Sequence, residues 1–318
     1  MSTNVRWETV SGFDAIVLEN RLVRAVVLPA LGGRVWELTD RMRDRQWIWH
    51  REGLPLTAAV SGAIYDDVWA GGWEELFPND APCEFEGRAL PDHGIWWTIN
   101  WRVSTAIKGD VAILRLTATT SGPHTGCVKE FRLGSDSNTL RVSYRIKNHE
   151  QNAFHFLFKQ HFPIALSPLC RLALPGGRVT AVDTSFGTLL TSSEAFAWPR
   201  TVGASGIEVD LTRVLDRSSA AREFVYVSDL PDAWCGVEDL ERGASLRLRY
   251  DRKQLPYVWL FLTYGGWRGC HTAVLEPCTN MPKDLDTALR RGQSARLLPG
   301  EVFETHASVT LCELGVPR

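Results

Sequence analysis

Cysteine pairs, long apolar runs and an excess of positive charge are all missing from this chain of 318 residues. The seven cysteines are scattered and form no C-x-x-C motif, so neither a disulfide framework nor a zinc ribbon is expected. No apolar run approaches the ~18 residues that a membrane-spanning helix requires, so we expect no membrane association. The net charge of −2 gives no basic excess, so we expect no nucleic-acid partner.

Targeting and nucleotide-binding signals are missing as well. The first residues show no basic segment followed by an apolar one, so we expect no secretory signal. Together with the scattered cysteines, this favours the cytoplasm. The chain has no G-x-G-x-x-G motif, no Walker loop and few helical patterns, which excludes the common α/β nucleotide-binding folds.

What is present is a repeated alternation of apolar and polar residues. Residues 139–147 alternate apolar side chains such as Leu140 and Val142 with polar ones such as Arg141, and residues 244–250 repeat the pattern. Such alternation is typical of half-buried antiparallel strands. Further strands are predicted over residues 23–28, 111–119, 127–133, 154–162, 224–227, 257–264, 272–275 and 302–311.

A single helix is predicted, over residues 283–291. Pro282 precedes it and Gly292 follows it, as expected at the two ends of a helix. Neither a flexible linker nor an internal repeat divides the chain. We therefore expect an all-β protein, a single antiparallel β-sandwich domain over residues 1–318 with few short helices.

The segment 154–162 is the most informative one for function. If it forms one strand, four phenylalanines line one face, and His155, Lys159 and His161 line the other. Two imidazoles and an ammonium group on one face suggest acid–base chemistry, although a solvated sheet face would produce the same pattern. The two histidines would lie about 20 Å apart along a straight strand, so we expect no metal ion between them.

Glu276 is the second candidate. It ends the apolar strand predicted over residues 272–275 and directly precedes Pro277. A carboxyl group held at a sheet end in partly apolar surroundings would have a raised pKa and act as a better base. A glutamate that simply points into water would give the same sequence pattern.

Two further segments read as loops with demanding backbone geometry, residues 71–79 (GGWEELFPN) and residues 91–97 (PDHGIWW). Their tryptophans, Trp73, Trp96 and Trp97, could form a wall on which a sugar ring stacks. Each of them would fit a buried core equally well.

Taken together, these segments resemble the aldose 1-epimerase (galactose mutarotase-like) family over most of the chain. The resemblance implies a supersandwich of large antiparallel sheets with a sugar cleft. The carrying segments, in order, are residues 20–23, 31–34, 71–79, 93–94, 159–163, 275–277 and 298–301.

The resemblance also implies roles for particular residues. Glu276 matches the catalytic base, His161 the histidine that protonates the ring oxygen, and His93 a second histidine that orients the substrate. Proton transfers alone open and close the ring, so no cofactor or metal is expected. Further substrate contacts are expected from Arg34, Trp73, Glu75, Trp97, Lys159 and Asp210.

The expected substrate is a free, unphosphorylated monosaccharide. Family members that act on sugar phosphates carry an arginine shortly after the His-Gly pair, whereas residues 95–97 here read IWW. Lys159, Arg34 and Arg268 would suit an acidic sugar. The sequence leaves a homodimer open, because it does not fix the oligomeric state.

Two other functions stay open. A lyase or hydrolase acting on oligosaccharides would need a tyrosine or a second carboxylate beside the base, and Tyr257 and Tyr264 are candidates. A sugar-binding module without catalysis would keep the tryptophans but would not need both Glu276 and His161.

Overall fold

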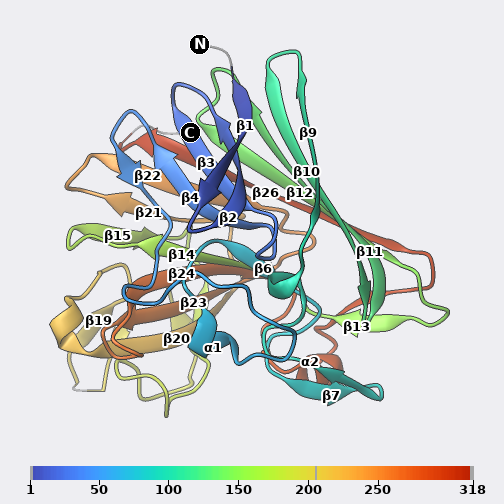
Figure 1. The fold of residues 1–318 in the computed structure, drawn as a ribbon. Coiled ribbons are helices and arrows are strands. Elements are labelled where there is room, and N and C mark those ends of the chain that lie inside the picture. The colour runs from blue at the N-terminus through green and yellow to red at the C-terminus, as the bar shows by residue number, and fades with distance from the viewer. Residues whose placement is uncertain (1–2, 205, 316–318) are drawn as a thin grey trace.

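The computed structural model of the chain describes residues 3–204 and 206–315, and antiparallel strands dominate it (Figure 1). A five-stranded sheet has the order β1 (Asn4–Val10), β2 (Phe13–Glu19), β3 (Val23–Leu28), β4 (Arg34–Asp40) and β5 (Arg45–Gln46). An eight-stranded sheet has the order β15 (Cys170–Ala173), β21 (Trp234–Asp239), β22 (Ala244–Tyr250), β26 (Val302–Glu313), β12 (Thr139–Asn148), β11 (His124–Gly134), β10 (Val111–Ser121) and β9 (Arg102–Lys108). A seven-stranded sheet has the order β17 (Phe196–Ala197), β16 (Arg178–Ala181), β20 (Ala221–Ser228), β23 (Tyr257–Tyr264), β24 (His271–Cys278), β14 (Lys159–Ala165) and β6 (Glu74–Leu76).

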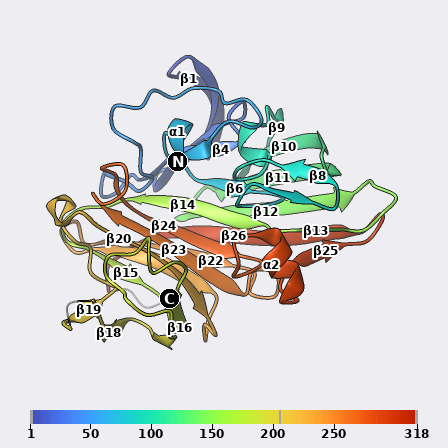
Figure 2. The same ribbon diagram turned by 90° about the horizontal axis from the view of Figure 1, so that it is seen from below.

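Short elements complete the fold. Three two-stranded ribbons pair β13 (Phe154–Phe156) with β25 (Ala295–Leu297), β18 (Arg200–Val202) with β19 (Glu208–Asp210), and β7 (Cys83–Phe85) with β8 (Arg88–Leu90). The helices are α1 (Tyr65–Val68) and α2 (Leu285–Arg290), with 3-10 turns η1 (Trp96–Thr98) and η2 (Arg217–Ser219). Seen from below, α1 and α2 lie on either side of strands β14, β24 and β23 (Figure 2).

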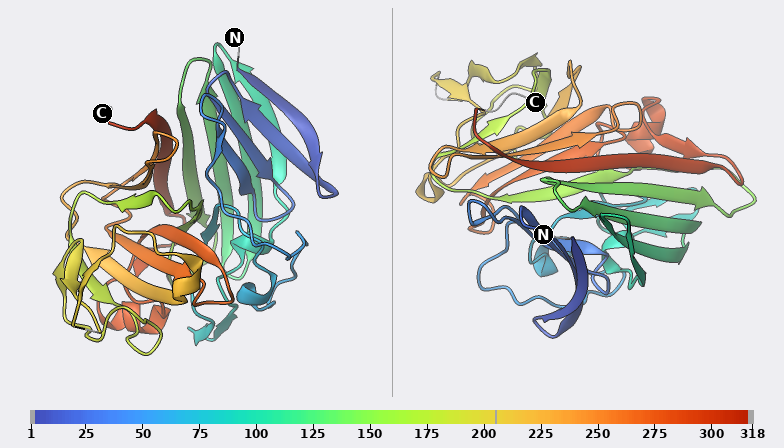
Figure 3. Two further views of the ribbon diagram at one scale, coloured as in Figure 1. Left: turned by 90° about the vertical axis from the view of Figure 1, so that its left-hand side faces the viewer. Right: turned by 90° about the horizontal axis from the view of Figure 1, so that it is seen from above.

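The three sheets share one hydrophobic core. Alternate residues of β12 and β22, such as Leu140 and Leu246, join Ile16 of β2 and Leu260 of β23 in a single buried cluster. The five-stranded sheet packs over the end of the eight-stranded sheet that contains β9, β10 and β12. The seven-stranded sheet lies below the five-stranded sheet in the view of Figure 1 (see also Figure 3). Burial of the apolar face of each strand explains why the alternation in the sequence locates so many of the strands.

The expected all-β sandwich of antiparallel sheets is confirmed, and the predicted strands 23–28, 244–250 and 257–264 coincide with β3, β22 and β23. The predicted helix is confirmed as α2, whose N-cap Asp284 accepts a hydrogen bond from the Thr287 N–H at 3.1 Å.

The single strand predicted over 154–162 is wrong, because it is broken into β13 and β14. The N–H groups of Leu157 and Phe158 leave the ladder and donate to Pro78 O (2.7 Å) and Thr279 Oγ1 (3.0 Å). His155 consequently belongs to a different sheet from His161.

No helix within the described part of the chain is long and apolar enough to cross a membrane.

Candidate active site

A pocket of about 220 Å³ lies between strands β14 and β24 and helix α1. Its lining includes Glu276, His161, His93 and Lys159, four residues that the sequence had singled out. A carboxylate, two imidazoles and an ammonium group therefore share one small cavity. This combination can both accept and donate protons.

Strands β14 and β24 supply three of these side chains. Lys159 and His161 are two positions apart on β14, so they project from the same face of the strand. Strand β24 lies between β14 and β23, and Glu276 stands opposite Trp259 of β23. Because both strands are almost wholly buried, the three side chains are held with little freedom: Lys159, His161 and Glu276 are 2%, 5% and 2% exposed.

The Lys159 ammonium group sits between two carboxylates. Its Nζ lies 2.5 Å from Glu276 Oε2, forms a second ion pair with Asp80, and lies 4.1 Å from the centre of the Trp259 ring. Burial alone would lower the pKa of Lys159, but the two carboxylates outweigh it and raise that pKa above its usual value. Burial raises the pKa of Glu276, and the charge of Lys159 opposes that shift. Glu276 is thus a poorly solvated carboxylate beside the Lys159 ammonium group, which its two carboxylate partners keep protonated.

The loop before η1 holds His93 in an unusual backbone conformation. Its φ of 58° lies in the left-handed region, which costs energy for a residue other than glycine. The His93 N–H donates to Asp80 O at 2.7 Å, and the next residue must be glycine because a Cβ on Gly94 would meet Phe77 O at 2.3 Å. His93 Nδ1 lies 2.8 Å from Asp92 Oδ1. Burial alone would lower the pKa of His93, but the hydrogen bond to Asp92 and the charge of Asp80 raise it overall.

The second imidazole, His161, has a different environment. Its Nδ1 lies 3.2 Å from Tyr65 Oη, and the Trp69 ring packs against it edge-on at 4.9 Å between centres. Burial and the nearby positive charge of Lys159 hold the pKa of His161 well below its usual value. The ring centres of the two histidines are 6.2 Å apart, yet the pKa of His93 is raised and that of His161 is lowered.

Tyr65 connects the pocket to a buried ion pair. Its ring stacks on His93 at 3.9 Å, and its hydroxyl donates to Glu74 Oε1. Glu74 Oε2 accepts from Arg34 Nε at 3.0 Å and from Arg34 Nη2 at 2.6 Å, while Arg34 Nη1 donates to Gly71 O. The expected contact of Arg34 with a substrate is therefore corrected, because this side chain lies behind the pocket and fixes Glu74.

Aromatic rings form the rest of the cavity wall. Two of the rings are indoles, from Trp69 in the turn after α1 and from Trp267 in the loop after β23. Their ring centres are 6.3 Å apart. Apolar ring faces of this kind suit the C–H faces of a sugar. The other rings in the lining are Phe186, Phe224 and Phe261.

The three tryptophans that the sequence proposed for this wall lie elsewhere. Trp96 is fully buried in the core. Trp73 is fully buried in the core and donates through Nε1 to Gln160 Oε1 at 2.8 Å. Trp97 is 3% exposed and donates to Gly94 O at 3.0 Å, so it supports the His93 loop from behind. None of the three lines the pocket, so the proposed wall of Trp73, Trp96 and Trp97 is corrected.

Two acidic residues also lie away from the pocket. Glu75 points into the core, where Lys129 Nζ lies 2.5 Å and Tyr144 Oη 2.6 Å from its carboxylate oxygens. Asp210 lies on β19 and accepts from Arg200 Nε at 3.2 Å, in a separate surface hollow. The expected substrate contacts of both residues are corrected by their positions.

Several lining residues were not predicted from the sequence. Tyr65 begins a helix of four residues, and Trp69 directly follows it; so short a helix has no periodic pattern to reveal it. Asp80 directly follows the segment 71–79, and Trp267 follows a glycine pair just as Trp73 does, so both had a usable signal. The remaining unpredicted polar residues of the lining are Asp66, Asp183 and Lys283.

Charged groups in the pocket are satisfied mainly by one another. Lys159 is paired with Asp80 and Glu276, and His93 with Asp92. Among residues 3–204 and 206–315 no three His, Cys, Asp or Glu side chains are arranged to hold a metal ion. The expected absence of a metal stays a prediction, which metal analysis of the purified protein can test.

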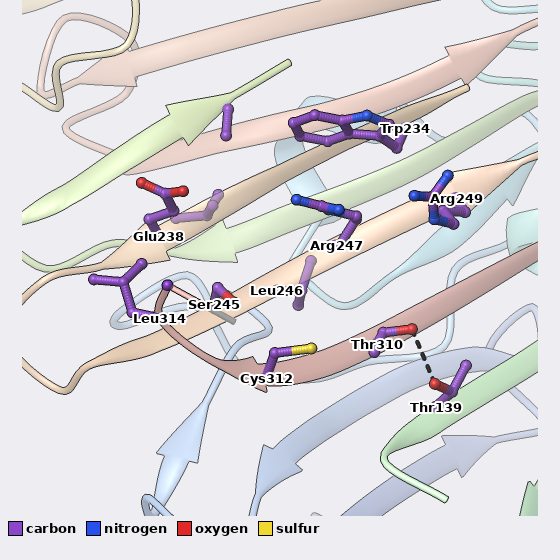
Figure 4. Close-up of a pocket in the computed structure, with 13 residues that line it drawn as sticks. Thr139, Trp234, Glu238, Ser245, Leu246, Arg247, Arg249, Thr310, Cys312 and Leu314 are labelled. Carbon is purple, nitrogen blue, oxygen red and sulfur yellow. Dashed lines mark hydrogen bonds between the residues drawn. The ribbon is translucent and has the colours of Figure 1, made fainter. Parts of the chain in front are cut away.

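A second hollow, of about 380 Å³, lies on the eight-stranded sheet over β21, β22 and β26 (Figure 4). Its lining includes Trp234, Arg247 and Arg249, and the Arg247 guanidinium lies 4.2 Å from the centre of the Trp234 ring. Among its described lining residues Glu238 is the one carboxylate, and there is no histidine. It lacks a pair of groups that could exchange protons near neutral pH, so the pocket at β14 and β24 is the candidate active site.

No protein-family model matches the chain. Solved structures do share its fold. A galactose mutarotase-like protein from Clostridium acetobutylicum matches with a TM-score of 0.75 at 14% identity, over 98% of this chain and 99% of its own. A protein from Klebsiella pneumoniae that is provisionally assigned as an aldose 1-epimerase matches with a TM-score of 0.74 at 12% identity, over 95% of this chain and 80% of its own. A TPR-domain containing protein from Parabacteroides distasonis matches with a TM-score of 0.70 at 15% identity, and the chain spans about half of it, 48%. The chain therefore has the galactose mutarotase-like fold that the sequence predicted.

Proposed function

We propose that the protein is an aldose 1-epimerase that interconverts the anomers of a free, unphosphorylated monosaccharide. The observation that carries this proposal is the meeting of Glu276, His161 and His93 in one aromatic-walled pocket of about 220 Å³. A cavity of this size suits one sugar ring rather than a chain of several. The similarity in fold to mutarotase-like proteins supports the same activity.

The reaction needs only two coordinated proton transfers. Glu276 takes the proton of the anomeric hydroxyl while a protonated group in the pocket gives a proton to the ring oxygen. The bond between the anomeric carbon and the ring oxygen breaks, and the freed aldehyde turns about its bond to the next carbon. Closure from the other face, with the two protons returned, produces the opposite anomer.

The ion pairs of Lys159, Arg34 and Arg268 favour a neutral sugar over an acidic one. Lys159 is already neutralised by Asp80 and Glu276. The other two cations considered for an acidic sugar are also paired, Arg34 with Glu74 and Arg268 with Asp67 at 2.7 Å. At Lys159 and Arg34, whose pairs are buried, a sugar carboxylate or sulfonate would have to displace these partners and leave a buried charge uncompensated.

The two tyrosines that the sequence offered to a lyase or hydrolase lie away from the pocket. Tyr257 accepts a hydrogen bond from Gln293 at 3.3 Å, and Tyr264 is buried with its hydroxyl directed at Arg213 O; neither lines the pocket.

All seven cysteines are unpaired, which supports the proposed cytoplasmic location.

The test follows the exchange of anomers by NMR over a panel of neutral, acidic and sulfonated aldoses, with the spontaneous rate subtracted. We expect acceleration of a neutral aldose, and a fall in kcat of roughly 10²–10⁴ for Glu276→Gln, the usual contribution of one positioned proton-transfer group. Sugar binding should change much less, because the aromatic wall is intact. If the unchanged protein accelerates no aldose, the proposal is wrong.

A further inference from the structure

We infer that His93 is the acid that gives its proton to the ring oxygen, and that Tyr65 and Glu74 hold His161 as a hydrogen-bond acceptor toward the sugar. This assignment rests on the proposed function, since it concerns the same pocket. It exchanges the roles that the family resemblance implied for the two histidines.

The proton of the Tyr65 hydroxyl has one possible acceptor among its charged neighbours. Glu74 accepts two hydrogen bonds from Arg34 and one from the Tyr65 hydroxyl, so it is an ionised carboxylate that only accepts. The single proton of the Tyr65 hydroxyl is therefore used toward Glu74. Tyr65 Oη can then only accept from the ring nitrogen that lies 3.2 Å away, His161 Nδ1.

The tautomer of His161 follows from that count. A neutral imidazole carries one N–H, and here it is on Nδ1, so Nε2 carries the lone pair. A second proton on this ring is opposed by burial, by Lys159 on the same strand, by His93 and by Arg34 behind Tyr65. The two carboxylates around it are already paired with cations: Glu74, which shares Tyr65 with His161, with Arg34, and Glu276, in the same pocket, with Lys159. At neutral pH His161 has no proton on Nε2 to give to a ring oxygen.

The environment of His93 is the opposite one. Asp92 Oδ1 accepts from its Nδ1 at 2.8 Å, and Asp80 adds a second negative charge nearby. Lys159 opposes a proton on His93, but that charge is shared between Asp80 and Glu276. With 19% of its side chain exposed, His93 also has more access to the cavity and to solvent than His161. Tyr65 stacks on the face of the ring and blocks neither nitrogen in the ring plane, where Nδ1 bonds to Asp92 and Nε2 can meet the sugar.

The protons balance with His93 as the acid. The N–H of the His93 imidazolium goes to the ring oxygen, which also receives the electron pair of the breaking bond to the anomeric carbon. The proton of the anomeric hydroxyl goes to Glu276, and the carbonyl double bond forms. When the ring closes, both protons return, so Glu276 and His93 end as they began. Throughout, His161 Nε2 accepts a hydrogen bond from a sugar hydroxyl.

The direct test is NMR of protein labelled with ¹⁵N in histidine, at neutral pH and without sugar. Two-bond couplings from the ring carbon-bound protons distinguish the neutral tautomers from the imidazolium. The signals are assigned with His93→Gln and His161→Gln. We expect His161 as the neutral Nδ1–H tautomer and His93 as the imidazolium, and we expect Tyr65→Phe to abolish the tautomer preference of His161. Finding His161 as imidazolium or as the Nε2–H tautomer overturns the inference.

Kinetics on the best aldose provide the second test. The rate should fall at acid pH as Glu276 binds a proton, and fall again at alkaline pH as His93 loses the proton it must give. His93→Gln should lower kcat by roughly 10²–10⁴ and remove the alkaline fall, whereas His161→Gln should mainly raise KM and keep it. The reverse pattern overturns the inference. If the unchanged protein accelerates no aldose, the proposed function fails, while the NMR result still decides which histidine carries the extra proton.

Discussion

Glu74 and Glu75 are adjacent on β6, and both are buried carboxylates that are paired with a cation and accept a hydrogen bond from a tyrosine. Since successive side chains of a strand point to opposite faces, the two have different hydrogen-bond partners. Glu74 pairs with Arg34 and, through Tyr65, reaches His161 in the pocket.

Glu75 is enclosed on the other side of the strand. Its partners are Lys129, which also donates to Gly33 O at 2.8 Å, and Tyr144. Lys129 and Tyr144 are 0% and 2% exposed, and among the residues that the structure describes no hydrogen bond of this group leads to a titratable residue of the pocket. Burial and charge pairing alone therefore do not mark a functional residue. What distinguishes Glu74 is a hydrogen-bonded connection to a group that can meet the substrate.

The largest effect on the free energy of unfolding should come from Lys129→Met, which breaks the buried ion pair between Lys129 and Glu75. Removing one partner of a buried ion pair leaves an uncompensated charge and costs about 3–5 kcal/mol. Burial raises the pKa of Glu75 above its usual value although the charge of Lys129 opposes that shift, so removing Lys129 should raise the pKa further in the folded state. A raised folded-state pKa gives stability that is lost as the pH rises, so the variant should be more stable at mildly acid pH than at neutral pH.

Urea unfolding of Lys129→Met at both pH values checks this. The double variant Lys129→Met with Glu75→Gln is the control, because it removes the charge that the single variant strands. It should recover most of the lost free energy of unfolding. A loss below about 1 kcal/mol, the size expected of an exposed pair, would show that this pair is more solvated than its burial implies.

The two tyrosines offer a matched comparison with a smaller effect. Tyr65→Phe and Tyr144→Phe each remove one hydrogen bond to a buried carboxylate, so each should lower the free energy of unfolding by about 1–3 kcal/mol. Only Tyr65→Phe should change catalysis, because it frees the His161 ring. We expect kcat/KM to fall about 10-fold, equivalent to ~1.4 kcal/mol of transition-state binding.

Steady-state rates and urea curves measured on the same preparations separate the two effects. Equal losses of activity in Tyr65→Phe and Tyr144→Phe would mean that activity follows stability, and the distinction between the two glutamates would then have no functional meaning.

The sequence revealed the strands that have one buried and one open face, such as β22. It missed β2, whose residues from Ala15 to Leu18 are buried on both faces and so show no alternation. The break between β13 and β14 could not be predicted either, because its cause is a pair of hydrogen bonds to residues distant in the chain, Pro78 and Thr279.

The site shows the same limit. Glu276, His161, His93 and Lys159 could be found because each stands out against apolar or glycine-rich neighbours in the sequence. Tyr65 could not, because its importance comes from contacts to three separate segments. Glycine pairs precede both Trp73 and Trp267, yet tertiary packing sends the first indole into the core and the second into the pocket wall.

The smallest effect is expected at Asp210, which the family resemblance suggested as a substrate contact. Its Oδ1 accepts from Thr212 Oγ1 at 2.6 Å and from the Thr212 N–H at 3.0 Å, and its Oδ2 accepts from Arg200. These bonds close the β18–β19 ribbon, away from the pocket lining. In Asp210→Asn the amide oxygen can still accept from Thr212, and the lost ion pair is a weak one because the Arg200 side chain is 62% exposed. The free energy of unfolding should fall by less than about 1 kcal/mol, and kcat and KM should stay within ~2-fold of the unchanged protein. Glu276→Gln, assayed alongside, shows what the loss of a pocket carboxylate does. A rise in KM of about tenfold or more for Asp210→Asn, equivalent to ~1.4 kcal/mol of binding, would show that Asp210 does contact the substrate. The β18–β19 ribbon would then have to close over the pocket during turnover.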